Sequence, residues 1–207
     1  MYVPPTLAKS DPGEIAAFMR RHSFATLISH DGQAPFATHV PVLFKADAGK
    51  HGTITAHIAK ANPQWQHFAN GKEVLVIFQG PHAYISPSWY ETKAAVPTWN
   101  YAVVHAYGVP CIITDHDRVV AMLHDLVETY EAGRENRWPG DMSEEFRDKM
   151  IGGIVGFEID ITRIEAKYKL SQGRSLADVQ GVIAALSASP DQTERELAAM
   201  MKKYTRF

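Results

Sequence analysis

Short segments with strand character and hairpin-like spacing dominate the first half of the chain. In one of them Ala37, His39 and Pro41 alternate with Thr38, Val40 and Val42, which is typical of a half-buried strand. The predicted strands are residues 24–29, 36–44 and 52–58. Asp31-Gly32 falls between the first two and favours a hairpin turn, and Pro41 indicates an edge strand or a bulge. The pattern predicts antiparallel pairing here.

Three later segments complete the predicted sheet. A continuous apolar run over residues 73–79 predicts a buried strand, and residues 101–114 predict a long strand that bends near Gly108. Alternation over residues 154–168 predicts one more strand or a strand pair. We expect a mainly β fold with peripheral helices (α+β), arranged as an antiparallel barrel, because the strands are short and their spacing is hairpin-like.

Capping residues mark the predicted helices. Ser, Asp and Asn accept hydrogen bonds from the free amides of a first helical turn, and Pro is tolerated there. The predicted starts are Ser10 or Asp11, Asn62, Asp115, Asp141, Ser175 and the segment 189–191. The whole chain, residues 1–207, is expected to form one domain that closes with helices over about 175–207.

An aromatic segment separates the two central strands. Residues 78–101 hold six aromatic residues and three prolines, and we predict a long loop. Trp and Tyr present stiff, flat surfaces with a polar edge, which favours the wall of a pocket for a planar ligand. An aromatic cluster packed beneath a long loop is the alternative interpretation.

Composition narrows the classes of function. The net charge of −2 gives no strongly basic face for nucleic acid. The single cysteine, Cys111, lies in an apolar run and is expected to be buried and inert. No apolar stretch is long enough to span a membrane and no signal peptide is evident, so we expect a cytoplasmic protein. The ten histidines are scattered and predict no zinc site, whereas a single haem ligand stays open.

The segment from residue 57 to residue 65 is the first candidate site. A strand ends, a lysine follows, and a helix starts two residues later, which places a cation beside free helical amides. That combination suits a phosphate group, although an ordinary capped helix beside a solvated lysine would have the same sequence. The candidate residues are His57, Lys60, Asn62, Gln64 and Trp65.

The segment from residue 169 to residue 175 is the second candidate site. A strand again delivers basic and polar side chains to a helix start, here Lys169, Gln172 and Arg174. The planar guanidinium of Arg174 suits a carbonyl or phosphate group. An exposed, well-capped helix entry is the alternative.

Several long blocks, in order along the chain, resemble one family. They are residues 1–4, 37–41, 57–65, 78–90, 96–101 and 169–175. Together they resemble the PaiB family of FMN-binding proteins, described as negative transcriptional regulators. The resemblance implies a split β-barrel like that of the pyridoxamine 5′-phosphate oxidases, assembled as a homodimer with FMN between the subunits.

The resemblance also assigns roles to residues. It implies that Lys60 and the helix start after it clamp the phosphate, and that Arg174 lies near the flavin ring. It places Thr38 and His39 on a strand beside the ring, and it implies contacts from the other subunit by Ser86, Ser88 and Trp89. The oxidases grip their substrate with an Arg-x-His pair, whereas this chain has Lys169-Leu170-Ser171, so oxidation of pyridoxamine phosphate is not expected.

Three functions are compatible with this sequence. The first is a flavin-linked regulator or sensor; the second is a flavin-dependent oxidoreductase of unknown substrate, with a pocket shaped by His57, His82 and His105. The third is a haem-binding or haem-degrading protein, by analogy of fold alone. A DNA or protein partner is not visible in the sequence, since acidic residues share the last helix with Arg195, Lys202, Lys203 and Arg206.

Overall fold

Eight strands form one sheet in the computed structural model, which describes residues 1–205. The hydrogen-bonding order is β3-β2-β6-β7-β8-β5-β4, with β1 paired to β8, and the order does not close on itself. The strands are β1 (Ala8–Lys9), β2 (Phe24–His30), β3 (Pro35–Pro41), β4 (Leu43–Lys45), β5 (Thr53–Ala59), β6 (Val74–Ile85), β7 (Thr98–Ile112) and β8 (Ile154–Lys169). This arrangement confirms the predicted antiparallel, mainly β fold class with added helices.

Five α-helices and three 3-10 helices accompany the sheet in residues 1–205. They are η1 (Pro5–Leu7), α1 (Pro12–Arg21), η2 (Pro63–Asn70), η3 (Pro87–Trp89), α2 (His116–Glu131), α3 (Glu144–Ile151), α4 (Leu176–Ser187) and α5 (Gln192–Tyr204). The predicted caps Asn62, Asp115 and Ser175 are confirmed. The cap predicted at Asp141 is wrong, because the side chain of Ser143 caps α3. The end of the predicted closing region, Arg206 and Phe207, lies outside the described residues.

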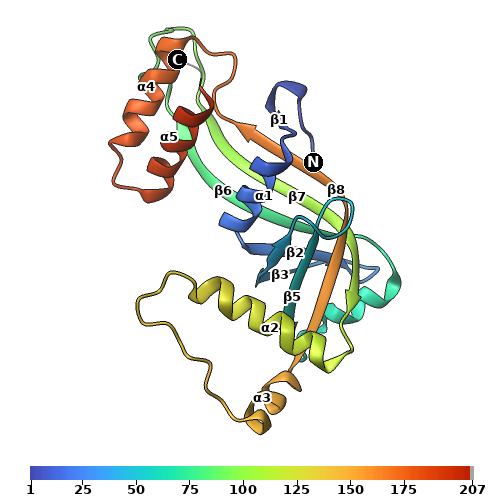
Figure 1. The fold of residues 1–207 in the computed structure, drawn as a ribbon. Helices are drawn as coiled ribbons and strands as arrows, with labels where there is room; N and C mark the ends of the chain where they lie inside the picture. Colours follow the sequence, from blue (N-terminus) through green and yellow to red (C-terminus); the bar gives the residue numbers. More distant parts are fainter. Residues whose placement is uncertain (206–207) are drawn as a thin grey trace. The chain divides into compact units, whose positions relative to one another are not determined.

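The chain divides into two compact units, which we describe separately. The first unit contains Met1–Phe18, Gln79–Val104 and the chain from Glu165 onward, and the second contains Met19–Phe78 and His105–Ile164. Figure 1 shows α4 and α5 side by side in the first unit, and α2 joined to α3 by a long segment in the second. The prediction of one domain over residues 1–207 stays a prediction.

The hairpin of β2 and β3 forms one edge of the sheet in the second unit. Its register runs from Phe24 opposite Pro41 to His30 opposite Pro35. The position of Pro41 on an edge strand confirms the expectation from its missing amide. On β5, Ile54 and Ala56 are fully enclosed, and Thr53 and Thr55 on the other face are buried as well, so the strand is covered on both faces over these residues.

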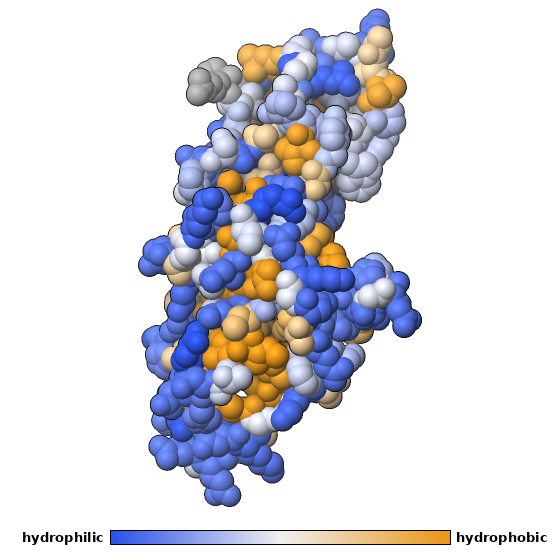
Figure 2. Space-filling model, turned by 90° about the vertical axis from the view of Figure 1, so that its right-hand side faces the viewer, coloured by the Kyte–Doolittle hydropathy of each residue, from blue (hydrophilic) through white to orange (hydrophobic). Residues whose placement is uncertain are grey.

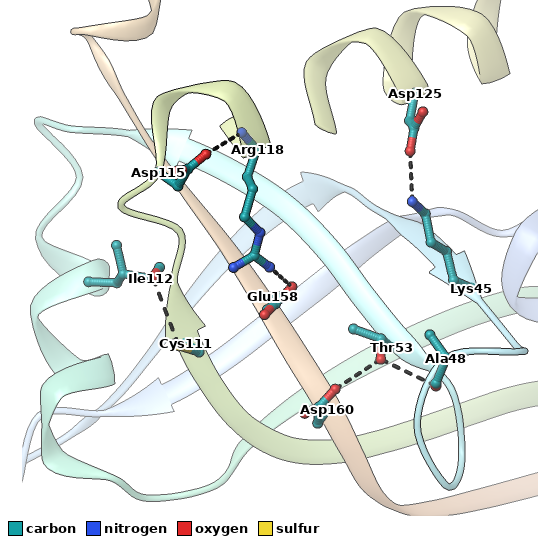
Figure 3. Close-up of polar contacts among 10 residues, drawn as sticks. All are labelled: Lys45, Ala48, Thr53, Cys111, Ile112, Asp115, Arg118, Asp125, Glu158 and Asp160. Atoms are coloured by element: carbon teal, nitrogen blue, oxygen red, sulfur yellow. Dashed lines mark hydrogen bonds and ion pairs between the residues drawn. The ribbon is translucent and has the colours of Figure 1, made fainter. Parts of the chain in front are cut away.

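Polar contacts attach α2 to the strands of the second unit (Figure 3). Lys45 of β4 pairs with Asp125 at 2.7 Å, and Arg118 pairs with Glu158 of β8 at 2.8 Å. Asp115 caps the helix by accepting the amide hydrogen of Arg118 at 2.8 Å. These contacts fix α2 over β4 and β8 and so define the walls of the cavities described below.

Half of the predicted aromatic loop over residues 78–101 is strand. β6 continues to Ile85 and β7 already begins at Thr98, so only the intervening residues are irregular or 3-10 helical. Alternation explains the extension of β6, since Ala83 and Ile85 are buried while His82 and Tyr84 point to solvent. The prolines suggested a loop, but Pro81 is accommodated inside β6.

The thiol of Cys111 is exposed, which contradicts the predicted buried position. Side chains alternate along β7, and Pro110 takes the buried position next to Cys111. An apolar run thus does not decide which of two neighbouring residues faces the core.

Hydrophobic residues gather in a patch in the lower half of the face shown in Figure 2, bordered by hydrophilic ones. No helix among residues 1–205 combines the length and apolar character needed to cross a membrane. The same described part of the chain contains no cluster of three or more His, Cys, Asp or Glu side chains placed to hold a metal ion.

Candidate functional site

Lys60 presents an exposed ammonium group directly after β5 in the second unit. Its amide nitrogen donates to the carbonyl of Gly153 at 2.8 Å, and its own carbonyl accepts the indole N–H of Trp65 at 3.0 Å. Lys60 and Trp65 border a cavity of about 300 Å³, and most of the other residues that line it are apolar. Within residues 1–205 the ammonium of Lys60 has no carboxylate partner. The fixed backbone therefore holds a cation without a counter-charge.

Asn62 connects the start of η2 to the edge strand β3. Its Oδ1 accepts the amide hydrogen of Gln64 at 3.0 Å, and its Nδ2 donates to Thr38 Oγ1 at 2.9 Å. The neighbouring residue, His39, has an exposed ring whose Nδ1 lies 3.0 Å from Oγ1 of Thr26 on β2. The structure therefore brings together Thr38 and Asn62, which the sequence separates by 24 residues.

Gln64 is fully buried and serves the protein's own backbone. Its Nε2 lies within hydrogen-bond distance of the carbonyls of Leu27 and Phe36, at 3.1 and 3.2 Å, and of Ser29 Oγ at 3.1 Å. These acceptors belong to β2 and β3, so the amide ties η2 to the hairpin. The role of Gln64 as a phosphate donor stays a prediction, and this geometry does not favour it.

His57 lies apart from Lys60. It lines a different cavity, of about 500 Å³, which is formed with α2, α3 and the segment between them. Burial lowers the pKa of His57, so the imidazole is held neutral. Its Nδ1 is buried and has no hydrogen-bond partner among residues 1–205.

Arg174 is the corresponding cation of the first unit. Its guanidinium carbon lies 4.4 Å from the centre of the Tyr90 ring, within cation–π range. Arg174 also borders a hollow of about 190 Å³ together with Ser171, Gly173 and Tyr204. No carboxylate among the described residues pairs with it.

Lys169 and Gln172 form the turn that leads to Arg174. The ammonium of Lys169 donates to Thr98 Oγ1. The Oε1 of Gln172 accepts the amide hydrogen of Leu170 at 2.7 Å, while its Nε2 donates to the carbonyl of Tyr168 at 2.6 Å. These bonds stabilise a turn in which Ser171 has a φ of 67°, a left-handed conformation uncommon for serine.

Ser88 and Trp89 lie in the short helix η3 of the first unit, and Ser86 is its N-cap. Ser86 Oγ accepts the amide hydrogen of Ser88 at 3.2 Å and lies 2.7 Å from its hydroxyl. The carbonyl of Trp89 faces α4 so closely that a Cβ at Gly181 would lie 2.1 Å from it. Trp89 itself is half-buried.

Asp178 is a positioning residue that the sequence analysis missed. It is almost fully buried, and its carboxylate accepts the amide hydrogens of Glu91 and Thr92, at 2.9 and 3.0 Å, and the Thr92 hydroxyl hydrogen at 2.8 Å. These hydrogen bonds lower the pKa of Asp178, and the bond from the backbone amide of Thr92 contributes most. In the sequence, Asp178 is marked only by its position three residues after Ser175, which indicated a helix cap and not a contact with residues 91 and 92.

An aromatic group lies on the outer face of the first unit. The rings of Tyr84 and Trp99 meet edge to face with centroids 6.1 Å apart, and His82 lies 6.3 Å from Trp99. Tyr84 and Trp99 are large and exposed. They are therefore not the packed satellite core that was the alternative interpretation of this segment.

Comparisons with known proteins identify relatives over most of the chain. The family described as "Putative FMN-binding domain" matches residues 1–163. The protein named protease synthase and sporulation protein PAI 2, from Bacillus subtilis, is 40% identical over 204 residues, which cover 98% of this chain and 97% of that protein. An uncharacterised Aspergillus fumigatus protein is 35% identical over 169 residues, covering 64% of this chain and 65% of its own.

Solved structures confirm the fold. The flavocytochrome Anf3 from Azotobacter vinelandii has a TM-score of 0.61 at 15% identity, covering 84% of this chain and 75% of that one. The FAD and heme binding protein from Mycobacterium smegmatis has a TM-score of 0.61 at 14% identity, covering 86% and 79%. At these identities the likeness concerns the split-barrel fold alone. The family match and the Bacillus relative show more: the chain belongs to the FMN-binding-domain family that includes PaiB.

Proposed function

We propose that this protein binds FMN as a homodimer and acts as a flavin-linked regulatory or sensor protein in the cytoplasm. The observation that carries the proposal is the pair of cations, Lys60 and Arg174, that each lie where a strand leads into a helix and border a cavity, with no acidic partner among residues 1–205. Lys45 and Arg118, by contrast, are paired with carboxylates of the protein. A phosphate monoester is a dianion, and it is bound by lysine, arginine and N–H donors.

The donor set fits a flavin mononucleotide. Lys60 would bind the phosphate at the start of η2, where Asn62 and Trp65 hold the backbone in place. Thr38 and His39 would lie beside the isoalloxazine on β3, which as an edge strand leaves one side open. Arg174 would approach the ring edge. Bound FMN supplies a redox-active ring, and the protein's residues supply its binding and orientation.

A homodimer is part of the proposal. The family resemblance implies that one subunit contributes Ser86, Ser88 and Trp89 to the flavin of the other. Two observations support an interface: the exposed aromatic pair Tyr84 and Trp99, and the hydrophobic patch of Figure 2. Sedimentation at several protein concentrations tests this part, and a monomer at all of them would contradict it.

A visible absorption titration with FMN tests the site. We expect a saturable shift of the flavin bands, and Lys60→Ala and Arg174→Ala should each weaken FMN about tenfold, which corresponds to the loss of one charge-assisted contact. Riboflavin lacks the phosphate, so its affinity should fall in Arg174→Ala but not in Lys60→Ala. Lys72→Ala and Lys202→Ala change exposed lysines elsewhere and serve as matched controls. Unchanged FMN affinity in both site variants would overturn the assignment.

The regulatory role rests on family membership and on the name of the Bacillus relative, which refers to protease synthesis and sporulation. DNA binding and partner binding, each measured with and without FMN, test it. Rapid reduction of the bound flavin by NADH or NADPH would favour the alternative, a flavin-dependent oxidoreductase.

A haem-binding protein is the second candidate, because two neighbours in fold are named as a flavocytochrome and as an FAD and heme binding protein. A haem titration beside the FMN titration separates the two. A sharp haem absorption band without a flavin shift would replace FMN by haem as the ligand.

A further inference from the structure

The cavity that contains His57 has features of a ligand site of its own. It measures about 500 Å³, within the usual range for small-molecule pockets, and lies entirely in the second unit. Its walls are mainly apolar side chains of α2, α3 and the segment between them. Val120 and Val127 project from one side and Met150 from the other. Of the predicted flavin-site residues, only His57 lines it.

Large apolar side chains that line the cavity are partly exposed to solvent. Trp138, Met142 and Met150 are 44%, 40% and 48% exposed, although all three line the cavity. Contiguous exposed apolar surface around a hollow is typical of a binding groove rather than of an ordinary surface. An apolar ligand would remove this surface from water, and each Å² so covered favours binding.

Polar groups also line the cavity, and besides His124 they are His57 and Arg147. His57 Nδ1 is buried without a partner in residues 1–205, and a buried polar atom without a hydrogen bond is uncommon in a folded protein. Arg147 of α3 also lines the cavity and is half-buried; its Nε lies 3.4 Å from Asp148 Oδ1. The guanidinium is a planar fork that matches a carboxylate. The cavity thus combines a hydrocarbon interior, a cation and a neutral imidazole.

We propose that this cavity binds an amphiphilic monocarboxylic acid, such as a medium-chain fatty acid or an aromatic acid, independently of the flavin. The apolar portion lies against Val120, Val127 and Met150, and Trp138 and Met142 cover it. The carboxylate pairs with Arg147. His57 Nδ1 gains a hydrogen-bond partner from the ligand's polar end or from a water molecule that the ligand holds there.

Calorimetric titration of the full chain with decanoate, decanol and decylamine tests the class of ligand. We expect saturable binding of decanoate at one site per chain, with decanol weaker and decylamine absent. Arg147→Gln should weaken decanoate about tenfold while leaving decanol unchanged, because only the acid uses the charge. Equal affinity for the acid and the alcohol, or no saturable binding of decanoate, would overturn the proposal.

Two cavity-filling variants test the location. Val127→Phe and, separately, Val120→Phe place a ring inside the cavity and should abolish decanoate binding, whereas Ala121→Phe on an exposed position of α2 should not. Unaltered decanoate binding in both filled variants would refute the site. FMN affinity should be the same in all of these variants, and its loss together with decanoate would show that the cavity belongs to the flavin site, against the proposal.

Discussion

The starts of η2 and α4 look alike in the sequence and differ in the structure. In both, a strand delivers a cation, a glutamine and a capping residue within a few positions. At η2 the glutamine, Gln64, is fully buried and holds three acceptors on β2 and β3. At α4 the glutamine, Gln172, is exposed and only closes its own turn.

The comparison shows that different polar residues at a helix start have different roles: some stabilise the fold and others are available to a ligand. In each place the glutamine satisfies the backbone of the protein, and the cation has no acidic partner in the part of the chain that the structure describes. The tie to the rest of the unit comes from Gln64 at η2, but from the buried carboxylate of Asp178 at α4. Replacing each glutamine and each cation in turn, and measuring stability and ligand binding, would show which side chains maintain the fold and which bind a ligand.

Gln64→Ala should have the largest effect on stability. It leaves the carbonyls of Leu27 and Phe36 without the donor from Gln64, whereas Ser29 Oγ keeps His67 Nδ1 at 2.8 Å. We expect a loss of about 3 kcal/mol for two such acceptors. Urea unfolding measures the change, with the exposed neighbour Gln66→Ala as the control. A variant as stable as the wild type would contradict the structural role assigned to this amide.

Gly181→Ala should come next. The added Cβ would lie 2.1 Å from the Trp89 carbonyl, so α4 must move away from η3. We expect a loss of about 2 kcal/mol, typical of overpacking, measured by the same unfolding experiment. The exposed neighbour Gln180→Ala should cost little; if the two variants lose the same stability, the close approach of α4 to η3 is not tight in solution.

Gln172→Ala should have a smaller effect than Gln64→Ala, although it also removes two hydrogen bonds to the backbone. Water can replace those bonds at an exposed turn, so we expect less than about 1 kcal/mol. Thermal unfolding of both glutamine variants in parallel gives the contrast directly. Equal losses would remove the distinction between the two helix starts.

His57 should give the smallest effect, seen as a pH dependence. Burial lowers the pKa of His57 below the ordinary value of 6.5, so the unfolded chain takes up this proton at a higher pH than the folded protein does. Stability should therefore fall as the pH drops from about 6.5 through the lower folded pKa. Urea unfolding between about pH 7.5 and pH 5 should show a shallower fall in His57→Gln. The same profile in both proteins would rule out a buried neutral His57.

Local chemistry explains which predictions succeeded. The caps at Asn62, Asp115 and Ser175 were correct because a capping side chain bonds an amide two or three residues away, and nothing distant is needed. The strands β2 and β5 were likewise predicted from short local segments of the sequence. The same local rule failed at Asp141, where Ser143 offered a competing cap two residues later.

The candidate site was predicted only in part. Lys60, Asn62 and Arg174 lie where a strand meets a helix, as expected. The contact between Thr38 and Asn62 was not predicted. The separation of His57 from Lys60 into different cavities was not predictable, because it depends on where α2 and α3 cover β5. The hydrogen bond from the Thr92 amide to Asp178, 86 residues later in the chain, was not predictable either.

The sequence by itself thus determined the antiparallel class, most of the helix starts and the family, since each rests on short-range periodicity, on local hydrogen bonds or on long ordered motifs. Only the tertiary structure decided the burial of Gln64, the exposure of Cys111 and the extension of β6 and β7 into the two ends of the aromatic segment. These depend on which side of a strand meets the core and on which distant backbone groups need a partner. Both are properties of packing that a residue's neighbours in sequence do not carry.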